Sequence, residues 1–178
     1  GLLASISFAS LGYSVICGDP HKPVTHANDA GADLRTTAFL QPAKNFMQSL
    51  DLWEELKSHA VPMEIMRIID AAGENWPPKE KTTKDFLSSD ISDLPFGWNI
   101  PNWLLRRAFT EKANKYSNLE LKFGLTTSSF IRRDDAAFVY LDDGSQIKAK
   151  LVIGADGRNS FIRKKSQIKI SRTEFTQK

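Results

Sequence analysis

The chain has 178 residues, of which 41% are hydrophobic and 25% charged, so it can bury one core and part of a second domain. Lys and Arg number 24 against 21 Asp and Glu, in mixed order, which excludes a strongly basic nucleic-acid-binding surface and is only a weak indication of anionic partners. The single cysteine excludes an internal disulfide framework, and no stretch reaches the apolar length of a membrane span or begins like a signal peptide.

The first 20 residues have the order glycine, helix, glycine, strand, acid. Small and apolar residues at helical spacing predict a helix over residues 2–11, ended by Gly12, and a β-branched run predicts a strand over residues 13–18. In β-α-β dinucleotide-binding units, the last glycine of the fingerprint opens the helix, and an acid about 20 positions on bonds the ribose. Gly1 and Asp19 have this separation. An ordinary helix–strand pair that ends in a turn is the alternative.

The middle of the chain reads as a loop, a long helix and then strands. Residues 21–34 are polar and predict a loop, and a helical pattern runs from Arg35, with a break near residues 49–51, until Pro62 ends it. Residues 64–71 predict a strand, residues 73–83 a polar loop and residues 86–87 a short strand. His21, His26 and His59 are scattered without metal-ligand spacing, so no metal site is predicted.

The second half begins with a strand that passes into a helix. Residues 99–102 form this junction, in which Pro101 suits the first turn and Asn102 is a good N-cap for a helix that continues to Tyr116. Period-two alternation then predicts strands at residues 119–123, 126–132, 136–141 and 146–153. Asp142, Asp143 and Gly144 predict a tight hairpin turn before the last of these strands.

Residues 152–163 are the most informative stretch. The apolar run 151–153 stops at the small acidic turn Gly154-Ala155-Asp156-Gly157, and a basic segment with helix-start character follows. Ligands of open α/β sheets bind beyond the carboxyl ends of the strands. Asp156 could accept from a hydroxyl or order a water there, and Arg158 and the amides after it could meet phosphate. A solvated surface turn is the alternative.

Four segments together resemble a known family: residues 1–19, 33–38, 99–106 and 154–160. They are similar to the single-component flavoprotein aromatic hydroxylases of the para-hydroxybenzoate hydroxylase type. Residues 35–40 (RTTAFL), which run into 50–56 (LDLWEEL), and residues 97–102 (GWNIPN) resemble the branch that hydroxylates the ring of ubiquinone precursors. The resemblance covers nearly the whole chain, which would be about the amino-terminal half of a full-length member.

The resemblance implies an α/β fold: a Rossmann-like FAD-binding domain with a parallel sheet, helices and a β-meander, plus part of a β-sheet substrate domain, truncated at both ends. The first part of the FAD-binding domain would be residues 1–62 and its second part residues 99–168. Substrate-domain strands would occupy residues 63–98, and residues 169–178 would begin the next part of that domain.

The resemblance also implies a set of cofactor-binding residues. Gly1 would be the third glycine of the FAD pyrophosphate loop, and Asp19 the acid that binds the ribose. Arg35 and Asn102 would contact FAD, although a solvated charge and a plain N-cap are the alternatives. Arg106 would be a surface or phosphate-facing cation. Asp156 and Gly157 match the Asp-Gly motif associated with FAD and NAD(P)H. Arg158 would face the pyrophosphate, and Asn159 and Ser160 would cap the next helix.

The implied activity is that of an FAD-dependent monooxygenase. NAD(P)H reduces FAD, and O2 is then used to hydroxylate an aromatic ring, here a polyprenyl phenol intermediate of ubiquinone biosynthesis. The cofactor carries the chemistry, so no catalytic side chain is named, and these residues alone are expected to be inactive. A cytoplasmic location is expected, with peripheral contact with the inner membrane or a biosynthetic complex left open. The alternatives are another flavin oxidoreductase or epoxidase of the same fold, and a non-catalytic nucleotide-binding scaffold.

Tryptophans could form a stacking site for a flavin or an aromatic ring. Trp53 lies on an apolar helix face and is predicted to belong to the core. Trp98 and Trp103 flank Asn102, and Trp76 lies in a polar loop. Core packing is the favoured interpretation for Trp98 and Trp103.

Overall fold

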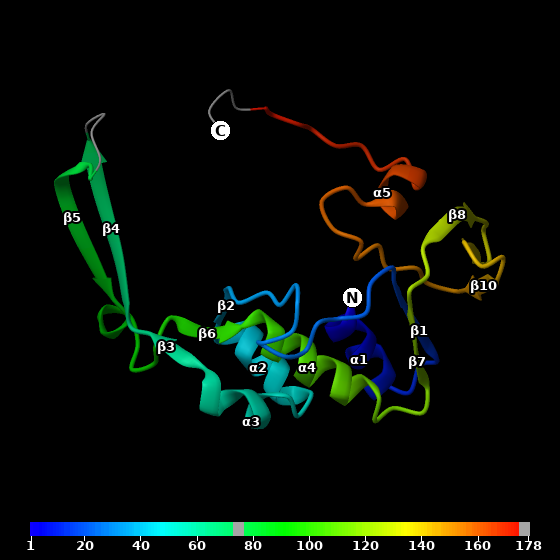
Figure 1. Ribbon diagram of the computed structural model, residues 1–178, viewed down its shortest axis with the longest axis horizontal. Helices are drawn as coiled ribbons and strands as arrows, with labels where there is room; N and C mark the ends of the chain where they lie inside the picture. The colour runs from blue at the N-terminus through cyan, green and yellow to red at the C-terminus, as the bar shows by residue number, and fades with distance from the viewer. Residues whose placement is uncertain (73–76, 175–178) are drawn as a thin grey trace. The chain divides into compact units, whose positions relative to one another are not determined.

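The computed structural model describes residues 1–72 and 77–174, which form two compact units (Figure 1). The first unit consists of residues 1–22 and 116–178, and the second of residues 23–115. Trp76 and part of the loop predicted at residues 73–83 lie outside the described residues, as do the last four residues of the segment 169–178.

The first unit is built on a parallel strand pair. Strand β1 (Val15–Asp19) pairs with β7 (Leu119–Phe123), and helix α1 (Leu2–Ser10) packs against both. Ile6, on the buried face of α1, is fully buried. The predicted helix and strands are therefore confirmed. The helix ends as expected at Gly12, whose φ of +86° lies in the left-handed region that glycine tolerates best.

One side chain connects the two sequence segments of this unit. The Asn118 amide donates to the carbonyl of Ala9 at 2.9 Å and to the carbonyl of Tyr13 at 2.7 Å. The backbone carbonyl of Asn118 accepts from the backbone amide of Val15 at 2.8 Å. The turn between α1 and β1 is therefore attached to the residue that precedes β7.

Asn118→Ala should lower the free energy of unfolding by about 1.5 kcal/mol, because two side-chain hydrogen bonds to backbone carbonyls are lost, one of them in a partly buried position. Urea denaturation followed by circular dichroism measures this change. Asn114→Ala is the matched control: Asn114 is exposed, and its side chain has no hydrogen bond among the described residues. Equal losses in the two variants would contradict the role given to Asn118.

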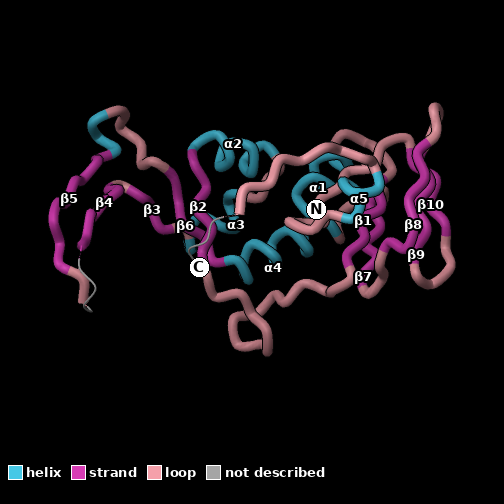
Figure 2. Tube along the Cα trace, turned by 90° about the horizontal axis from the view of Figure 1, so that it is seen from above, coloured by secondary structure: helices cyan, strands magenta, loops and turns pink. Residues whose placement is uncertain are grey.

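A β-meander and a short helix complete the first unit. Strands β8 (Thr127–Arg132), β9 (Ala137–Leu141) and β10 (Gln146–Ala149) lie side by side in the antiparallel order β10-β9-β8 (Figure 2). The predicted hairpin turn is confirmed: Gly144, at φ +84°, donates to the Leu141 carbonyl. Helix α5 (Phe161–Lys165) begins after Ser160, whose hydroxyl accepts from the Arg163 amide, as the cap prediction requires.

The last strand is shorter than predicted. Strand β10 ends at Ala149, which pairs with Ala137, the first residue of β9. Residues 150–153 extend past the end of their neighbour and form no strand, so the prediction of a strand over residues 146–153 is wrong at its carboxyl end. Leu151 and Ile153 are consequently 62% and 49% exposed.

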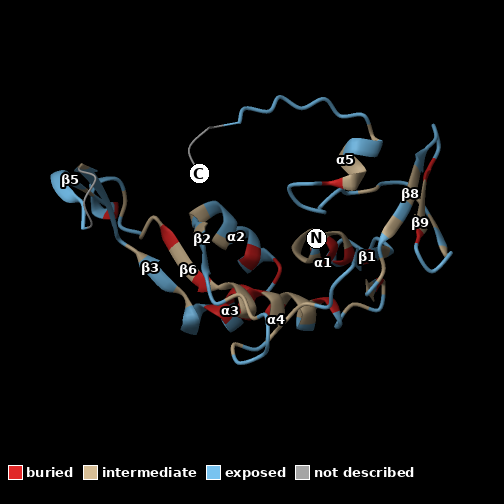
Figure 3. Ribbon diagram, turned by 45° about the horizontal axis from the view of Figure 1, so that its top comes forward, coloured by how far each residue is buried: buried red, intermediate tan, exposed pale blue. Residues whose placement is uncertain are grey.

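The second unit contains a three-stranded antiparallel sheet covered by helices. Its strands β2 (Thr36–Leu40), β6 (Gly97–Pro101) and β3 (Val61–Met63) have the order β2-β6-β3. The helices are α2 (Gln41–Ser49), α3 (Trp53–Leu56) and α4 (Asn102–Ala113), with 3-10 turns at Lys57–His59 and Ser88–Asp90. Buried residues cluster on β6, α3 and α4 (Figure 3), and the fully buried large side chains are Met47, Leu52, Leu56, Ile100 and Leu104.

The helix predicted from Arg35 is wrong over its first residues. Residues 36–40 form β2 because they pair along their whole length with β6, from Thr36 opposite Pro101 to Leu40 opposite Gly97. The β-branched Thr36 and Thr37 favour a strand, and Pro42 suits the first turn of a helix that begins later. The predicted break near residues 49–51 is confirmed, since α2 ends at Ser49.

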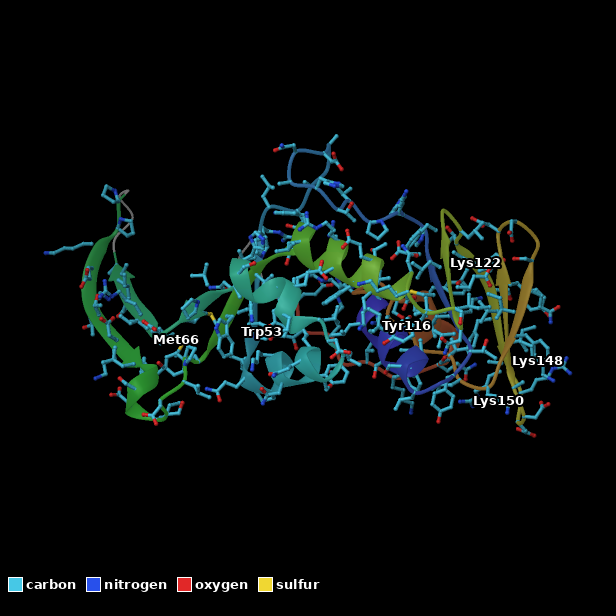
Figure 4. The ribbon with its side chains drawn as sticks, turned by 90° about the horizontal axis from the view of Figure 1, so that it is seen from below. Trp53, Met66, Tyr116, Lys122, Lys148 and Lys150 are labelled. Atoms are coloured by element: carbon cyan, nitrogen blue, oxygen red, sulfur yellow. The ribbon has the colours of Figure 1, made fainter. Side chains whose placement is uncertain are left out.

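Gly97 allows β2 and β6 to approach closely. A Cβ at this position would lie 2.2 Å from the Phe39 carbonyl oxygen and 2.9 Å from the Leu40 Cα, both of them backbone atoms. One residue on, Trp98 packs edge-to-face against Trp53 of α3, with ring centroids 5.2 Å apart. Trp53 is labelled in Figure 4. The prediction that Trp53 belongs to the core is confirmed, since it is buried.

Strands β4 (Ile65–Ala72) and β5 (Lys79–Leu87) form a long two-stranded ribbon, on which Met66 is labelled in Figure 4. The predicted strand over residues 64–71 is confirmed. The prediction of a loop over residues 73–83 is wrong for residues 79–83, which belong to β5 because they pair with the second half of β4. Across the ribbon, the Arg67 guanidinium donates to both oxygens of Asp85, at 2.7 and 2.8 Å.

None of the helices in the described part of the chain is long and apolar enough to cross a membrane.

Candidate functional site

Three polar side chains of the second unit converge on the carboxylate of Asp33. Arg35 donates from Nε to Oδ1 and from Nη2 to Oδ2, each at 2.9 Å. The Asn102 amide donates to Oδ2 at 3.0 Å, and the Arg106 Nη2 lies 3.6 Å from the same oxygen. The Thr37 hydroxyl donates to the Asn102 Oδ1 at 2.5 Å. We call Asp33, Arg35, Thr37, Asn102 and Arg106 the Asp33 cluster.

Backbone contacts explain why the cluster forms at this place. The loop that ends at Arg35 contacts the start of α4: the backbone amide of Asn102 donates to the backbone carbonyl of Arg35 at 2.9 Å, and the backbone amide of Trp103 donates to the backbone carbonyl of Asp33 at 3.3 Å. Two free amides of the first helical turn thereby find acceptors. The strand pairing of β2 with β6 holds Thr37 beside the same helix start.

The electrostatics of the cluster favour an anionic partner. The hydrogen bonds from Arg35 and then from Asn102 hold the pKa of Asp33 well below its usual range, and Asp33 in turn raises the pKa of Arg35. The carboxylate is therefore ionised at neutral pH, and two guanidiniums face one negative charge. The Asp33 side chain is 13% exposed, whereas that of Arg35 is 84% exposed. The accessible charge of the cluster is consequently positive.

The structure corrects two expectations at this site. The N-cap of α4 is Pro101 and not Asn102, which is the first helical residue. The Asn102 side chain is instead engaged by Asp33 and Thr37, which supply an acceptor and a donor. Arg35 does not open a helix, because it precedes strand β2.

The remaining predicted site residues lie in the first unit. Gly1 is the N-cap of α1, and its carbonyl accepts from the Ser5 amide at 3.0 Å. A Cβ on Gly1 would meet the Cys17 sulfur at 3.9 Å, so the helix start lies against β1. Asp19 ends β1, and its carboxylate accepts from the His21 amide at 2.9 Å. The carboxyl end of a parallel strand and a helix N-terminus are thus both present in this unit.

The Asp156 turn, residues 154–160, is closed by its own hydrogen bonds. Asp156 accepts from the Ser160 hydroxyl and, at 3.1 Å, from the Ile162 amide. Gly157 has a φ of +77°, which a side chain would strain. The Arg158 carbonyl accepts from the Arg163 guanidinium at 2.8 Å. The acidic turn is therefore a preformed loop at the start of α5.

Burial raises the pKa of Asp156, but the hydrogen bonds from Ser160 and from the Ile162 amide outweigh burial, and the net pKa lies below the ordinary value of 3.8. A depressed folded-state pKa stabilises the turn above the unfolded pKa, and this stabilisation is lost as pH falls through the folded pKa. The Ile162 amide resonance should therefore titrate with a midpoint below 3.8. NMR titration measures it, and Asp156→Asn should abolish it. A midpoint at or above the ordinary value would contradict these hydrogen bonds.

Asp33 is the residue that sequence reasoning missed. It lies inside the segment 33–38, yet no role was predicted for it. The available signal was a carboxylate two residues before an arginine, at the end of a polar loop.

The fold is that of a nucleotide-binding α/β domain. One unit has a helix N-terminus and an acid at the end of a parallel strand, and the other unit has an exposed guanidinium cluster. The chain belongs to the FAD binding domain family, which matches residues 1–178. The donor set fits FAD, because guanidinium and amide groups suit phosphate and ribose oxygens.

Comparisons with known proteins agree with this assignment. The chain is 26% identical to the ubiquinone hydroxylase UbiL of Rhodospirillum rubrum, over 92% of the chain and 36% of the relative. It is 25% identical to the 3-demethoxyubiquinol 3-hydroxylase of Escherichia coli, over 99% of the chain and 43% of the relative. The chain therefore spans between about a third and somewhat over two fifths of the length of these two relatives. The structure of the p-nitrophenol 4-monooxygenase PnpA of Pseudomonas putida shares the fold, with a TM-score of 0.71 and 17% identity over 93% of this chain and 40% of that one.

Proposed function

We propose that this chain is the amino-terminal part of an FAD-dependent monooxygenase that hydroxylates an aromatic ring with NAD(P)H and O2. The proposed substrate is a polyprenyl phenol intermediate of ubiquinone biosynthesis. Family membership and the names of the two ubiquinone-ring hydroxylases support the activity and the substrate class.

The observation that carries the proposal is the Asp33 cluster. A solvated surface arginine would need no fixed partners, but Arg35 is held by two hydrogen bonds to a largely buried carboxylate and remains 84% exposed. Guanidinium groups fixed in this manner bind phosphate and ribose oxygens with defined geometry. Asn102 adds an amide from the start of α4, which strengthens the case for a nucleotide ligand.

In this proposal the residues bind and orient FAD. Gly1 leaves the N-terminus of α1 open for the pyrophosphate, and Asp19 accepts from the ribose hydroxyls. Arg35 and Asn102 bind the nucleotide part of the cofactor. The Asp156 turn contributes the carboxylate of Asp156, the close backbone approach at Gly157 and the cation of Arg158 as a further set of contacts.

The division of chemistry follows from these roles. FAD, when bound, supplies the redox chemistry that takes electrons from NAD(P)H and activates O2. The chain's own residues hold the cofactor, fix its orientation and keep its phosphate charges compensated. A polyprenyl substrate would also favour a cytoplasmic protein in peripheral contact with the inner membrane or with a biosynthetic complex.

The visible absorption spectrum of the protein expressed from the complete reading frame that contains this chain tests the proposal. We expect a flavin spectrum near one FAD per chain, and O2 uptake with NAD(P)H that increases when a phenolic ring substrate is added. A colourless, well-folded protein would overturn the proposal in favour of a nucleotide-free scaffold. A flavin protein that oxidises NAD(P)H without any ring hydroxylation would overturn the substrate class and retain the cofactor.

A further inference from the structure

The contacts of Asp33 set the orientation of Arg35. The carboxylate engages the Nε and Nη2 edge of the guanidinium, in the bidentate arrangement that fixes both the distance and the plane of the group. The Arg35 amide also donates to Oδ1, at 3.2 Å, so the backbone and the side chain of Arg35 are held by the same oxygen. The remaining Nη1 amino group has no hydrogen-bond partner among the described residues and faces away from the carboxylate.

The same carboxylate also determines where the amide lies relative to the guanidinium. Oδ2 accepts from both Arg35 and Asn102, and the Arg106 guanidinium lies 3.6 Å from it. Asn102 is separated from Asp33 by 69 residues, so this spacing comes from tertiary structure and not from a local turn. A single acceptor thus fixes the relative positions of groups from a loop and from a helix.

A free arginine would lose side-chain conformational entropy when it binds a ligand. An arginine that is already oriented loses less, which is the general benefit of preorganised sites. The depressed pKa of Asp33 indicates that the carboxylate stays ionised and holds its partners throughout the neutral range.

We infer that Asp33 is the positioning residue of the nucleotide site: it holds Arg35 and Asn102 in the orientation in which they bind the nucleotide part of FAD. This inference rests on the proposed function. Asp33 itself is an acceptor without protons to donate, so it contributes through Arg35 and Asn102 and not by contact with phosphate.

The sign of the expected effect separates positioning from simple charge. FAD carries negative phosphates, so removing the negative charge of Asp33 would strengthen binding if only net charge mattered. If Asp33 positions Arg35 and Asn102, its removal weakens binding despite the more positive site. Asp33→Asn is therefore expected to weaken FAD binding by about tenfold.

The ribbon β4–β5 provides a matched control. Asp85 forms the same bidentate pair with Arg67 on exposed strands, and its pKa is likewise lowered by Arg67. Asp85→Asn removes an equal charge and an equivalent ion pair without disturbing the Asp33 cluster. It should leave the dissociation constant of FAD within twofold of the wild type.

The experiment measures FAD dissociation constants by flavin fluorescence in the protein from the complete reading frame. The arginine Nε–H resonances are recorded by NMR in the 178-residue chain. Asp33→Asn should lose the protected Arg35 Nε–H signal and bind FAD more weakly. Asp33→Glu, which keeps a carboxylate, should recover part of both and serves as the test if Asp33→Asn fails to fold.

The outcomes are distinguishable. A wild-type protein that binds no FAD overturns the proposed function and the inference with it. A wild-type protein that binds FAD, with Asp33→Asn binding equally well or more tightly after loss of the Arg35 signal, overturns the inference alone. For Asp33→Glu, unchanged FAD affinity together with loss of the Arg35 signal would also overturn it, because FAD would then bind equally well to a guanidinium that is no longer held.

Discussion

Replacing Gly97 with alanine should destabilise the second unit by about 3 kcal/mol. The added Cβ would lie 2.2 Å from the Phe39 carbonyl oxygen. This oxygen is a backbone atom, so no side-chain rotation can relieve the clash. The strands β2 and β6 must therefore move apart, and Gly97 pairs with Leu40 at the end of that ladder. Urea denaturation followed by circular dichroism measures the loss.

Gly18→Ala is the control for this substitution. Gly18 also lies in a strand, but a Cβ there would meet the Lys122 carbonyl oxygen at 4.0 Å, which is an ordinary contact. The free energy of unfolding of the Gly18→Ala variant should change by less than about 1 kcal/mol, because the alanine side chain meets no steric clash and reduces the entropy of the unfolded chain. Equal free energies of unfolding for Gly97→Ala and Gly18→Ala would contradict the close approach of β2 and β6 at Gly97.

Arg35→Ala should weaken FAD binding on the order of 30-fold, because a charge-assisted donor to the nucleotide is lost. The variant also removes one of the two guanidiniums that face the Asp33 carboxylate, so the site becomes less positive, which acts in the same direction. Flavin fluorescence of the protein from the complete reading frame measures the dissociation constant. The fold should persist, since Arg35 is exposed and precedes β2.

The matched control for this variant is Arg67→Ala. Arg67 makes the same two hydrogen bonds to a carboxylate, on the ribbon β4–β5, and is also exposed. Its removal should leave FAD affinity unchanged within about twofold, which separates loss of a ligand contact from loss of a surface ion pair. Equal FAD affinity in Arg35→Ala and in the wild type would remove Arg35 from the nucleotide site.

Local patterns predicted most of the elements. The helix before Gly12 and the strands of the meander follow from short-range periodicity and turn residues, and the structure confirms them. The failures occur where a partner distant in sequence decides. Residues 36–40 have apolar spacing that suits a helix, but pairing with residues 97–101 makes them a strand. Residues 79–83 are polar, and pairing with β4 makes them a strand as well.

The same division applies to the candidate site. Arg35 and Asn102 could be selected because they lie in segments that resemble a flavoprotein family. Asp33 lies in one of these segments too, but its role was missed because it depends on a hydrogen bond from Asn102, 69 residues away. The roles of Gly1, Asp19, Asp156, Gly157 and Arg158 in binding FAD stay predictions.

The first unit is assembled from residues 1–22 and 116–178, and this division has a consequence for synthesis on the ribosome. Val15 pairs with Leu119, so β1 cannot pair with β7 until about a hundred further residues have been synthesised. Residues 23–115 can form their own contacts earlier. Closing so long a loop costs entropy, but a folded intervening unit shortens the effective loop. The second unit should therefore fold first, as an insertion between the two segments of the first unit, and the pairing of β1 with β7 follows when β7 has been synthesised.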